Sequence, residues 1–251
     1  MTMEARATSL PPPGPVDIRF ASLLLDFDGT LVPLEDDPHG VLVDDALVAL
    51  LTRLADRFEG RVAFVTGRSL AGIVSMLGPV SDRFALSGSH GAEQRLNGVE
   101  THPVRPPQLD VAAARMDQFV KLHPGVILET KSFGVGLHYR RVPEYGAAAT
   151  ILAHSIAADT GLAYQGGSMM AEVRVAGSDK GVAVTSLMQH VPMAGTVPIF
   201  LGDDETDEAG LAATVALGGM AIAVGPRRSA SAGFALAGPA AVRDWLGRLV
   251  A

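Results

Sequence analysis

The stretch Ala21-Ser22-Leu23-Leu24-Leu25-Asp26-Phe27-Asp28-Gly29-Thr30 decides the fold of this chain. Its opening residues form an apolar run, which indicates a buried strand, and the run ends abruptly in acidic residues and a glycine. A helical pattern over residues 44–58 follows it. A strand, a loop and a helix in this order predict one unit of a parallel sheet.

The same cycle repeats along the chain. We expect further strands at residues 61–65, 84–86 and 197–201, a helix after Ser69 and another helix after the last of these strands. Strands that alternate with helices predict a parallel sheet covered on both faces. The fold class is therefore α/β, with a doubly wound, parallel-sheet, Rossmann-like core.

The middle of the chain has a different pattern. Expected strands at 126–130, 133–139 and 170–175 surround an expected helix at 145–158, which is typical of an α+β unit. Prolines precede this block and Gly177 follows it. We therefore predict an inserted α+β cap domain at 106–176, a core formed by 18–105 and 177–251, and a disordered leader at 1–17. The two bodies would enclose a cleft.

Composition narrows the class of protein. The 251 residues are 48% hydrophobic, which suffices for a real core, and the net charge of -7 without a basic run argues against nucleic acid or an anionic membrane as a partner. There is no cysteine, so disulfides and thiolate metal sites are excluded. With no signal-peptide-like or membrane-spanning apolar run, we expect a cytoplasmic enzyme that is a monomer or a weak oligomer.

Asp26 and Asp28 are the first candidates for chemistry. Residues i and i+2 of a strand point to the same side, so both carboxylates face one site, and Gly29 lets the backbone turn sharply beside a ligand. A plain turn with helix-capping acids is the alternative. The buried strand before the pair and the Gly-Thr-Leu sequence after it favour a reactive pair.

A second acidic cluster, Gly202-Asp203-Asp204-Glu205-Thr206-Asp207-Glu208, follows the expected strand 197–201. Acids in the first turn of a helix complement its dipole, and Asp204 could be an N-cap, but this accounts for one or two acids only. A hard cation would neutralise the others, and ligands that are all oxygens favour magnesium.

Thr66 and Lys180 are candidates for binding an anion. Thr66 ends an expected strand and could offer its hydroxyl to a phosphate. Lys180 lies in the first turn of a helix expected at 179–188 with Ser178 as N-cap, where a cation opposes the helix dipole. Either an anion offsets that cost, or the ammonium is exposed to water.

In their order and placement, these four pieces resemble the four motifs of the haloacid dehalogenase superfamily. The resemblance implies Mg²⁺ bound by Asp26, the Asp28 carbonyl and Asp203. It implies that Asp26 attacks phosphorus to form an aspartyl phosphate, and that Asp28 protonates the leaving group and then activates water. Thr66 and Lys180 would bind the phosphoryl oxygens, and Asp204 and Asp207 would position the magnesium shell.

Further stretches are similar to the trehalose-6-phosphate phosphatase family in order and spacing. They are Ser89-His90-Gly91-Ala92-Glu93, Leu137-His138-Tyr139-Arg140, and Glu172-Val173-Arg174 ahead of Lys180-Gly181. This resemblance implies hydrolysis of trehalose 6-phosphate to trehalose and phosphate, the last step of trehalose biosynthesis. Other sugar phosphates, those of sucrose, glucosylglycerol or mannosylglycerate, are alternative substrates, and a mutase-type phosphotransferase is a further alternative.

The resemblance assigns Glu129, Lys131 and Glu172 to sugar recognition. Glu129 and Lys131 lie on one face of an expected strand, with Glu172 on a neighbouring one. A solvated sheet face is the alternative for all three. His90 could contact substrate or be a hydrogen-bonded structural histidine. His138 falls on the opposite strand parity from Lys131, so we expect a structural role for it.

Overall fold

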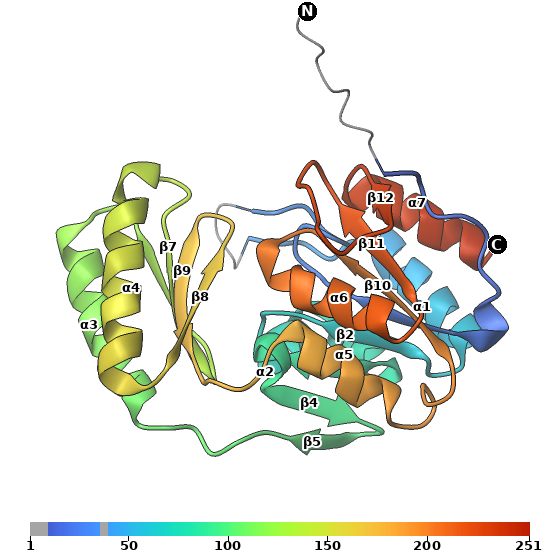
Figure 1. Cartoon of the computed structure of the whole chain (residues 1–251), viewed down its shortest axis with the longest axis horizontal. Helices are drawn as coiled ribbons and strands as arrows, with labels where there is room; N and C mark the ends of the chain where they lie inside the picture. Colours follow the sequence, from blue (N-terminus) through green and yellow to red (C-terminus); the bar gives the residue numbers. More distant parts are fainter. Residues whose placement is uncertain (1–9, 36–39) are drawn as a thin grey trace, which may run out of the picture.

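The computed structural model describes residues 10–35 and 40–251, and they form two bodies, each built on its own sheet (Figure 1). The larger body is the core, and the smaller one, formed by residues 108–174, is the cap. The predicted leader lies outside the described residues up to position 9. The described part of the leader contacts the core: the Ala235 amide donates to the Pro11 carbonyl at 3.0 Å.

The core sheet has eight strands, and the six from β12 to β3 run parallel. β4 and β5 extend its edge as an antiparallel hairpin that the sequence analysis missed. In sheet order the strands are β12 (Phe234–Leu236), β11 (Met220–Val224), β10 (Val197–Gly202), β1 (Ala21–Leu25), β2 (Val62–Val65), β3 (Ala85–Gly88), β4 (Glu93–Leu96) and β5 (Val99–Thr101).

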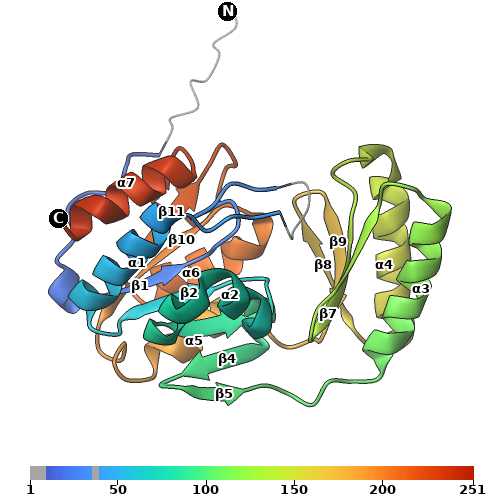
Figure 2. The ribbon, with the colours of Figure 1, turned by 180° about the vertical axis from the view of Figure 1, so that it is seen from behind.

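Helices cover both faces of the core sheet (Figures 1 and 2). Alternate side chains of the central strand β1 point to opposite faces of the sheet: Leu23 and Leu25 belong to one apolar cluster and Leu24 belongs to another. The first face is covered by α1 (Asp45–Phe58), α2 (Leu70–Leu77) and α7 (Pro239–Leu249), and the second by α5 (Lys180–Met188) and α6 (Glu208–Ala216). The predicted doubly wound α/β core is confirmed.

Local sequence explains where α1 begins and ends. The Asp44 side chain caps it by accepting from the Leu47 amide at 2.7 Å. Leucines at 47, 50, 51 and 54 and Phe58 then form the stripe that packs on the sheet. The helix stops at Glu59, which adopts the left-handed conformation with φ 50°.

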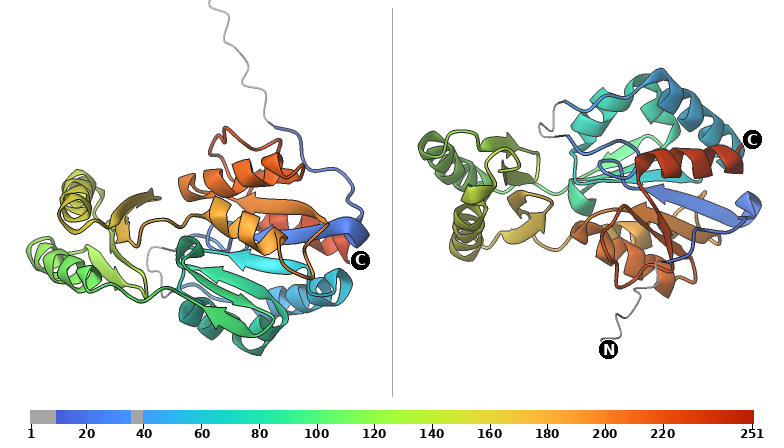
Figure 3. Two further views of the ribbon diagram at one scale, coloured as in Figure 1. Left: turned by 60° about the horizontal axis from the view of Figure 1, so that its bottom comes forward. Right: turned by 90° about the horizontal axis from the view of Figure 1, so that it is seen from above.

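The cap sheet is antiparallel, and two helices pack on its outer face (Figure 3). Its order is β6 (Ile127–Thr130), β7 (Gly134–His138), β9 (Met170–Arg174) and β8 (Ala163–Gly167), with α3 (Gln108–Leu122) and α4 (Gly146–Thr160) behind it. The chain enters the cap after β5 and leaves it before α5. The domain boundaries proposed at 106 and 176 remain a prediction.

Short 3-10 helices complete the described residues: η1 (Ile18–Phe20), η2 (Gly78–Arg83), η3 (Ser89–Gly91), η4 (Pro143–Tyr145) and η5 (Glu205–Asp207). Within the parts of the chain that the structure describes, no helix has both the length and the apolar character needed to cross a membrane.

Candidate active site

The polar residues predicted for the core site meet at the carboxyl ends of three neighbouring strands. Asp26 follows β1 directly, Thr66 follows β2, and Asp203 follows β10. Because β1 pairs with β10 on one side and β2 on the other, these ends lie at one edge of the sheet. The Asp26 amide extends the ladder by donating to the Leu201 carbonyl at 3.0 Å. All three side chains line one cavity between core and cap.

Lys180 links two buried carboxylates of this cavity. Its Nζ donates to Asp26 Oδ1 and to Asp207 Oδ1, each at 2.6 Å, and all three residues are at most 4% exposed. Burial alone would lower the pKa of Lys180, but Asp207 and Asp26 outweigh burial and raise the pKa. A cation in the first turn of a helix is unfavourable, and at Lys180 the two aspartates offset this cost.

Negative charge is in excess here. One oxygen each of Asp26, Asp203 and Asp207 lie within 4.8 Å of one another, and Lys180 supplies a single positive charge. Burial raises the pKa of Asp26 well above its ordinary value, and Asp207 and Asp203 add to the rise although Lys180 opposes it. Burial and Asp207 raise the pKa of Asp203 to about 6. A set of carboxylate oxygens with surplus negative charge fits a hard divalent cation.

Gly29 makes the close approach of Asp203 possible. It has φ 79°, in the left-handed region that favours glycine, and a Cβ at this position would lie 2.1 Å from Asp203 Oδ2. Thr30 lies next to it and its hydroxyl donates to Asp203 Oδ1 at 3.3 Å. The loop after β1 is thus shaped to bring the carboxylate of Asp203 beside that of Asp26.

Asp207 and Asp204 hold the 202–208 segment in place. Asp207 is fully buried, and its Oδ2 accepts from the amides of Asp203 and Asp204 at 3.1 and 2.9 Å. Asp207 therefore fixes the loop with one oxygen and bonds Lys180 with the other. Asp204 caps the following turn, as expected, and its Oδ2 also accepts from the Ser168 amide of the cap at 3.0 Å.

The cap contributes a group of paired charges. Lys131 Nζ lies 2.7 Å from Glu172 Oε2 and 3.7 Å from Glu129 Oε2, and His138 Nε2 lies 2.7 Å from the same Glu129 oxygen. Burial would raise the pKa of Glu172 and lower that of Lys131. Their mutual attraction outweighs burial in both cases. The pKa of Glu172 is lowered, with a further contribution from His90, and the pKa of Lys131 is raised, with a further contribution from Glu129.

His90 lies where the core meets the cap. It is 4% exposed with φ 53°, and neither ring nitrogen has a hydrogen-bond partner among the described residues. Nε2 lies 3.8 Å from Glu172 Oε2, too far for a hydrogen bond. Burial lowers the pKa of His90, although Glu172 opposes the shift. A buried ring with two free nitrogens beside a cavity is suited to a polar ligand.

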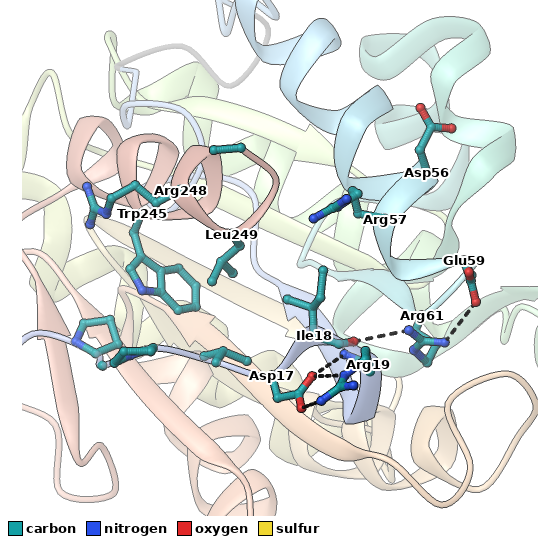
Figure 4. A pocket seen from close by; sticks show the side chains of 15 residues that line it. Asp17, Ile18, Arg19, Asp56, Arg57, Glu59, Arg61, Trp245, Arg248 and Leu249 are labelled. Atoms are coloured by element: carbon teal, nitrogen blue, oxygen red, sulfur yellow. Dashed lines mark hydrogen bonds and ion pairs between the residues drawn. The ribbon is translucent and has the colours of Figure 1, made fainter.

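A larger hollow lies at the other end of β1, between residues 13–19, the end of α1 and the end of α7 (Figure 4). Two of its arginines pair with two of its acids: Arg19 bonds Asp17 at 2.6 Å, and Arg61 lies 3.7 Å from Glu59. The acidic cluster and Lys180 do not line it. Size therefore does not identify the reactive site in this molecule.

Comparison with known proteins agrees with this geometry. The profile of the family described as Trehalose-phosphatase matches residues 24–237. The chain belongs to the trehalose-phosphatase family. Trehalose-6-phosphate phosphatase of Escherichia coli (strain K12) is 39% identical over 229 residues, which cover 88% of this chain and 83% of that protein.

Solved structures agree on the fold of this family member. The C-terminal domain of trehalose-6-phosphate phosphatase from C. albicans has a TM-score of 0.82 at 22% identity and covers 96% of this chain and 98% of that one. A phosphatase of the HAD superfamily from Bacteroides thetaiotaomicron has a TM-score of 0.56 at 16% identity, with 98% of both chains covered. The trehalose-phosphatase chain therefore has the haloacid dehalogenase fold, and its family consists of phosphatases.

Most residues predicted for the site of this trehalose-phosphatase line the cavity. Those that do are Asp26, Asp28, Thr66, His90, Glu129, Lys131, Lys180, Asp203 and Asp204. Glu172 and Asp207 lie behind it, each bonded to a lysine that does line it. The roles assigned to these residues remain predictions.

Two details of the sequence analysis were wrong. The N-cap of α5 is Asp179, whose side chain accepts from the Val182 amide at 2.8 Å, and not Ser178. His138 lines the cavity with Lys131. β6 and β7 pair antiparallel with Ile127 opposite His138, and cross-strand partners share a face, so parity counted along the chain across a turn misplaced His138.

Arg68 was missed as a site residue. Its guanidinium forms two hydrogen bonds with Asp28, from Nε to Oδ2 at 2.7 Å and from Nη2 to Oδ1 at 2.6 Å. The signal that could have found it is its place two residues after Thr66, at the end of the strand next to β1.

Proposed function

We propose that this protein hydrolyses trehalose 6-phosphate to trehalose and phosphate, with Mg²⁺ and through an aspartyl phosphate on Asp26. The observation that carries the proposal is the pair Asp26 and Asp28 at the end of β1, in one cavity with Thr66, Lys180 and Asp203. Membership of the trehalose-phosphatase family supports the choice of sugar.

Asp26, the Asp28 carbonyl and Asp203 would hold the Mg²⁺. The surplus of buried carboxylates over ammonium groups supports a divalent cation, and their oxygens are the ligands it prefers. Once bound, the cation would reduce the repulsion between the phosphate and the carboxylate of Asp26. Asp207 would position the loop that carries Asp203, and Asp204 would link that loop to the cap.

The residues of the chain then have distinct roles. An Asp26 oxygen attacks phosphorus, and the bond from phosphorus to the sugar oxygen breaks. Asp28 gives its proton to that sugar oxygen, and in the second step it takes a proton from the water that attacks the aspartyl phosphate. Thr66 and Lys180 bind the phosphoryl oxygens as negative charge moves onto them.

The cap residues would recognise the sugar. Glu129 and Lys131 line the cavity on the cap side, and Glu172 holds Lys131 from behind. Carboxylate and ammonium groups that already pair with one another can still bond to neutral hydroxyls through their remaining lone pairs and N–H groups. His90, which lies where the core meets the cap, has two ring nitrogens without a hydrogen-bond partner among the described residues, and they could bond to sugar hydroxyls.

The test is a substrate panel. Purified protein with Mg²⁺ is given trehalose 6-phosphate and the phosphates of sucrose, glucosylglycerol and mannosylglycerate, and the phosphate released is measured. We expect the highest kcat/KM for trehalose 6-phosphate. A preference for another sugar phosphate would overturn the substrate and leave the mechanism. Absence of phosphate release from every one of them would overturn both.

A further inference from the structure

Arg227 bonds the loop that carries Asp203, and the mechanism given above assigns it no role. Its Nε donates to the Asp203 carbonyl at 3.2 Å, and its Nη2 donates to the Asp204 carbonyl at 2.9 Å. Nη2 also donates to Glu208 Oε1 at 2.5 Å. Arg227 itself does not line the catalytic cavity, so any effect that it has on the reaction passes through the residues that it holds.

The backbone of Asp203 and Asp204 is bonded from two sides. Asp207 Oδ2 accepts from both of their amides, and the guanidinium of Arg227 donates to both of their carbonyls. These two residues lie beyond the last residue of β10 and before η5. All four of their backbone polar groups are therefore bonded to side chains. The direction of the Cα–Cβ bond of Asp203, and with it the place of its carboxylate, follows from this backbone.

Arg227 is anchored in its turn by the loop after β11. The carboxylate of Glu208 accepts from Arg227 with one oxygen and from Ser229 Oγ with the other, the second bond at 3.1 Å. Ser229 Oγ accepts from the amides of Ser231 and Ala232 at 3.1 and 2.9 Å. The side chains of Arg227 and Glu208 are 33% and 24% exposed, so water screens this pair only in part. The loops after β10 and β11 are thus joined through Arg227.

The charge and the geometry of Arg227 would affect a bound cation in opposite directions. A guanidinium near the carboxylates repels Mg²⁺, so its charge alone would weaken metal binding. Its planar fork, by holding two successive carbonyls, would strengthen metal binding, because a ligand that is already in place need not be ordered when the metal binds. Glu208 offsets the charge of Arg227, which leaves the geometric effect as the larger one.

We infer that Arg227 is a positioning residue that holds Asp203 and Asp204 in the backbone conformation that binds Mg²⁺. The inference rests on the proposed function, because it takes Asp203 as a ligand of the metal. Its consequence is that loss of Arg227 weakens Mg²⁺ binding, although the same change removes a positive charge from the neighbourhood of the site.

The experiment is a calorimetric titration of Mg²⁺ into the full chain at one neutral pH, without substrate. For both Arg227→Ala and Arg227→Lys we expect the Kd for Mg²⁺ to rise about tenfold, the lower end of the range for groups that orient metal ligands. Lysine keeps the charge but lacks the planar fork that bonds both carbonyls. With trehalose 6-phosphate, both variants should lose activity at low Mg²⁺ and return close to the wild-type kcat at saturating Mg²⁺.

Arg61→Lys is the matched control. Arg61 also donates to two backbone carbonyls, those of Ala21 and Ile18, each at 3.2 Å, and it pairs with a glutamate, Glu59. It lies at the opposite end of β1 from Asp26 and does not line the catalytic cavity. Its Kd for Mg²⁺ should equal that of the wild-type protein.

The two Arg227 variants separate positioning from charge. A wild-type Kd in Arg227→Lys would overturn the inference, because charge alone would then suffice. Unchanged or tighter binding of Mg²⁺ by Arg227→Ala would overturn it as well. Absence of Mg²⁺ binding by the wild-type protein would overturn the proposed metal site instead. Thermal melting of the metal-free variants, compared with that of Arg61→Lys, shows whether a weaker binding reflects a general loss of structure.

Discussion

The two sides of the cavity balance charge differently. On the core side, the ammonium group of Lys180 bonds Asp26 and Asp207, and one oxygen of Asp203 lies within 4.8 Å of an oxygen of each of these aspartates. On the cap side, acids and bases alternate, with Lys131 between Glu129 and Glu172 and His138 on Glu129. The carboxylates of the core cluster therefore exceed its positive charge, and a metal ion would offset the excess, whereas the cap side is largely paired and suits neutral hydroxyls. The expectations below test this division, beginning with the largest effect.

Asp26→Asn would test the core side most severely. The change removes the proposed nucleophile and proposed metal ligand but keeps the shape of the side chain, so we expect kcat to fall about 10⁴-fold or more. The fold should survive, because the amide can still accept from Lys180. Activity on trehalose 6-phosphate and circular dichroism are the measurements. Near-normal turnover by a variant of verified sequence would refute the mechanism.

Lys180→Met would remove the one positive charge of the core cluster. Turnover should fall about 10²- to 10³-fold, because the ammonium group proposed to stabilise phosphoryl oxygens is lost. Stability should also fall by about 3–5 kcal/mol, since two buried carboxylates lose their partner. Urea unfolding without metal measures this loss. The double variant Lys180→Met with Asp207→Asn should recover part of the stability but not the activity. Equal stability of the single and double variants would mean that the unpaired charge of Asp207 does not cause the loss.

Glu172→Gln would test the cap side. The change keeps the size of the side chain but removes the charge that holds Lys131, so kcat/KM for trehalose 6-phosphate should fall about 10- to 100-fold, the range for a hydrogen bond to a charged group. Hydrolysis of 4-nitrophenyl phosphate should change less than about threefold, because this substrate has no sugar for the cap to recognise. Glu144→Gln, at an exposed cap position, is the control. Equal losses on both substrates would remove Glu172 from sugar recognition.

Acidification should weaken metal binding on the core side. Burial and Asp207 raise the pKa of Asp203 to about 6 in the absence of metal. The folded protein then holds a proton on Asp203 below about pH 6, and Mg²⁺ must displace it. The apparent Mg²⁺ affinity should therefore fall as the pH drops below this value, by up to about tenfold per unit for the proton on Asp203. Calorimetric titration at several pH values measures it, and a constant affinity down to pH 5 would contradict the raised pKa.

Residues at the ends of parallel strands were more predictable from sequence than residues placed by strand register or long-range pairing, for a physical reason. Parallel strands bring their carboxyl ends to one edge, so Asp26 and Asp203 could be placed together once each strand was found. The face of His138 depends on the register of an antiparallel pair, and the Arg68–Asp28 pair joins residues 40 positions apart. Neither can be read from local pattern. The β4–β5 hairpin was missed although Asn97-Gly98, a common turn pair, lies between its strands.

Asp204→Ala should have the smallest effect and decides to which side Asp204 belongs. Its carboxylate accepts from the Glu205 amide at 2.6 Å and from the Ser168 amide of the cap at 3.0 Å. Loss of the N-cap should cost about 1 kcal/mol of stability. Loss of the Ser168 bond should raise KM for the sugar phosphate about threefold and leave kcat nearly unchanged, because one hydrogen bond contributes about 1 kcal/mol. The two amides donate to different oxygens of Asp204, so Asp204→Asn keeps an acceptor for one of them only and should have an intermediate effect. If Asp204→Ala instead lowered kcat a hundredfold and weakened Mg²⁺ binding, Asp204 would act on the metal, and the division between a core that binds charge and a cap that binds hydroxyls would have to be redrawn at this residue.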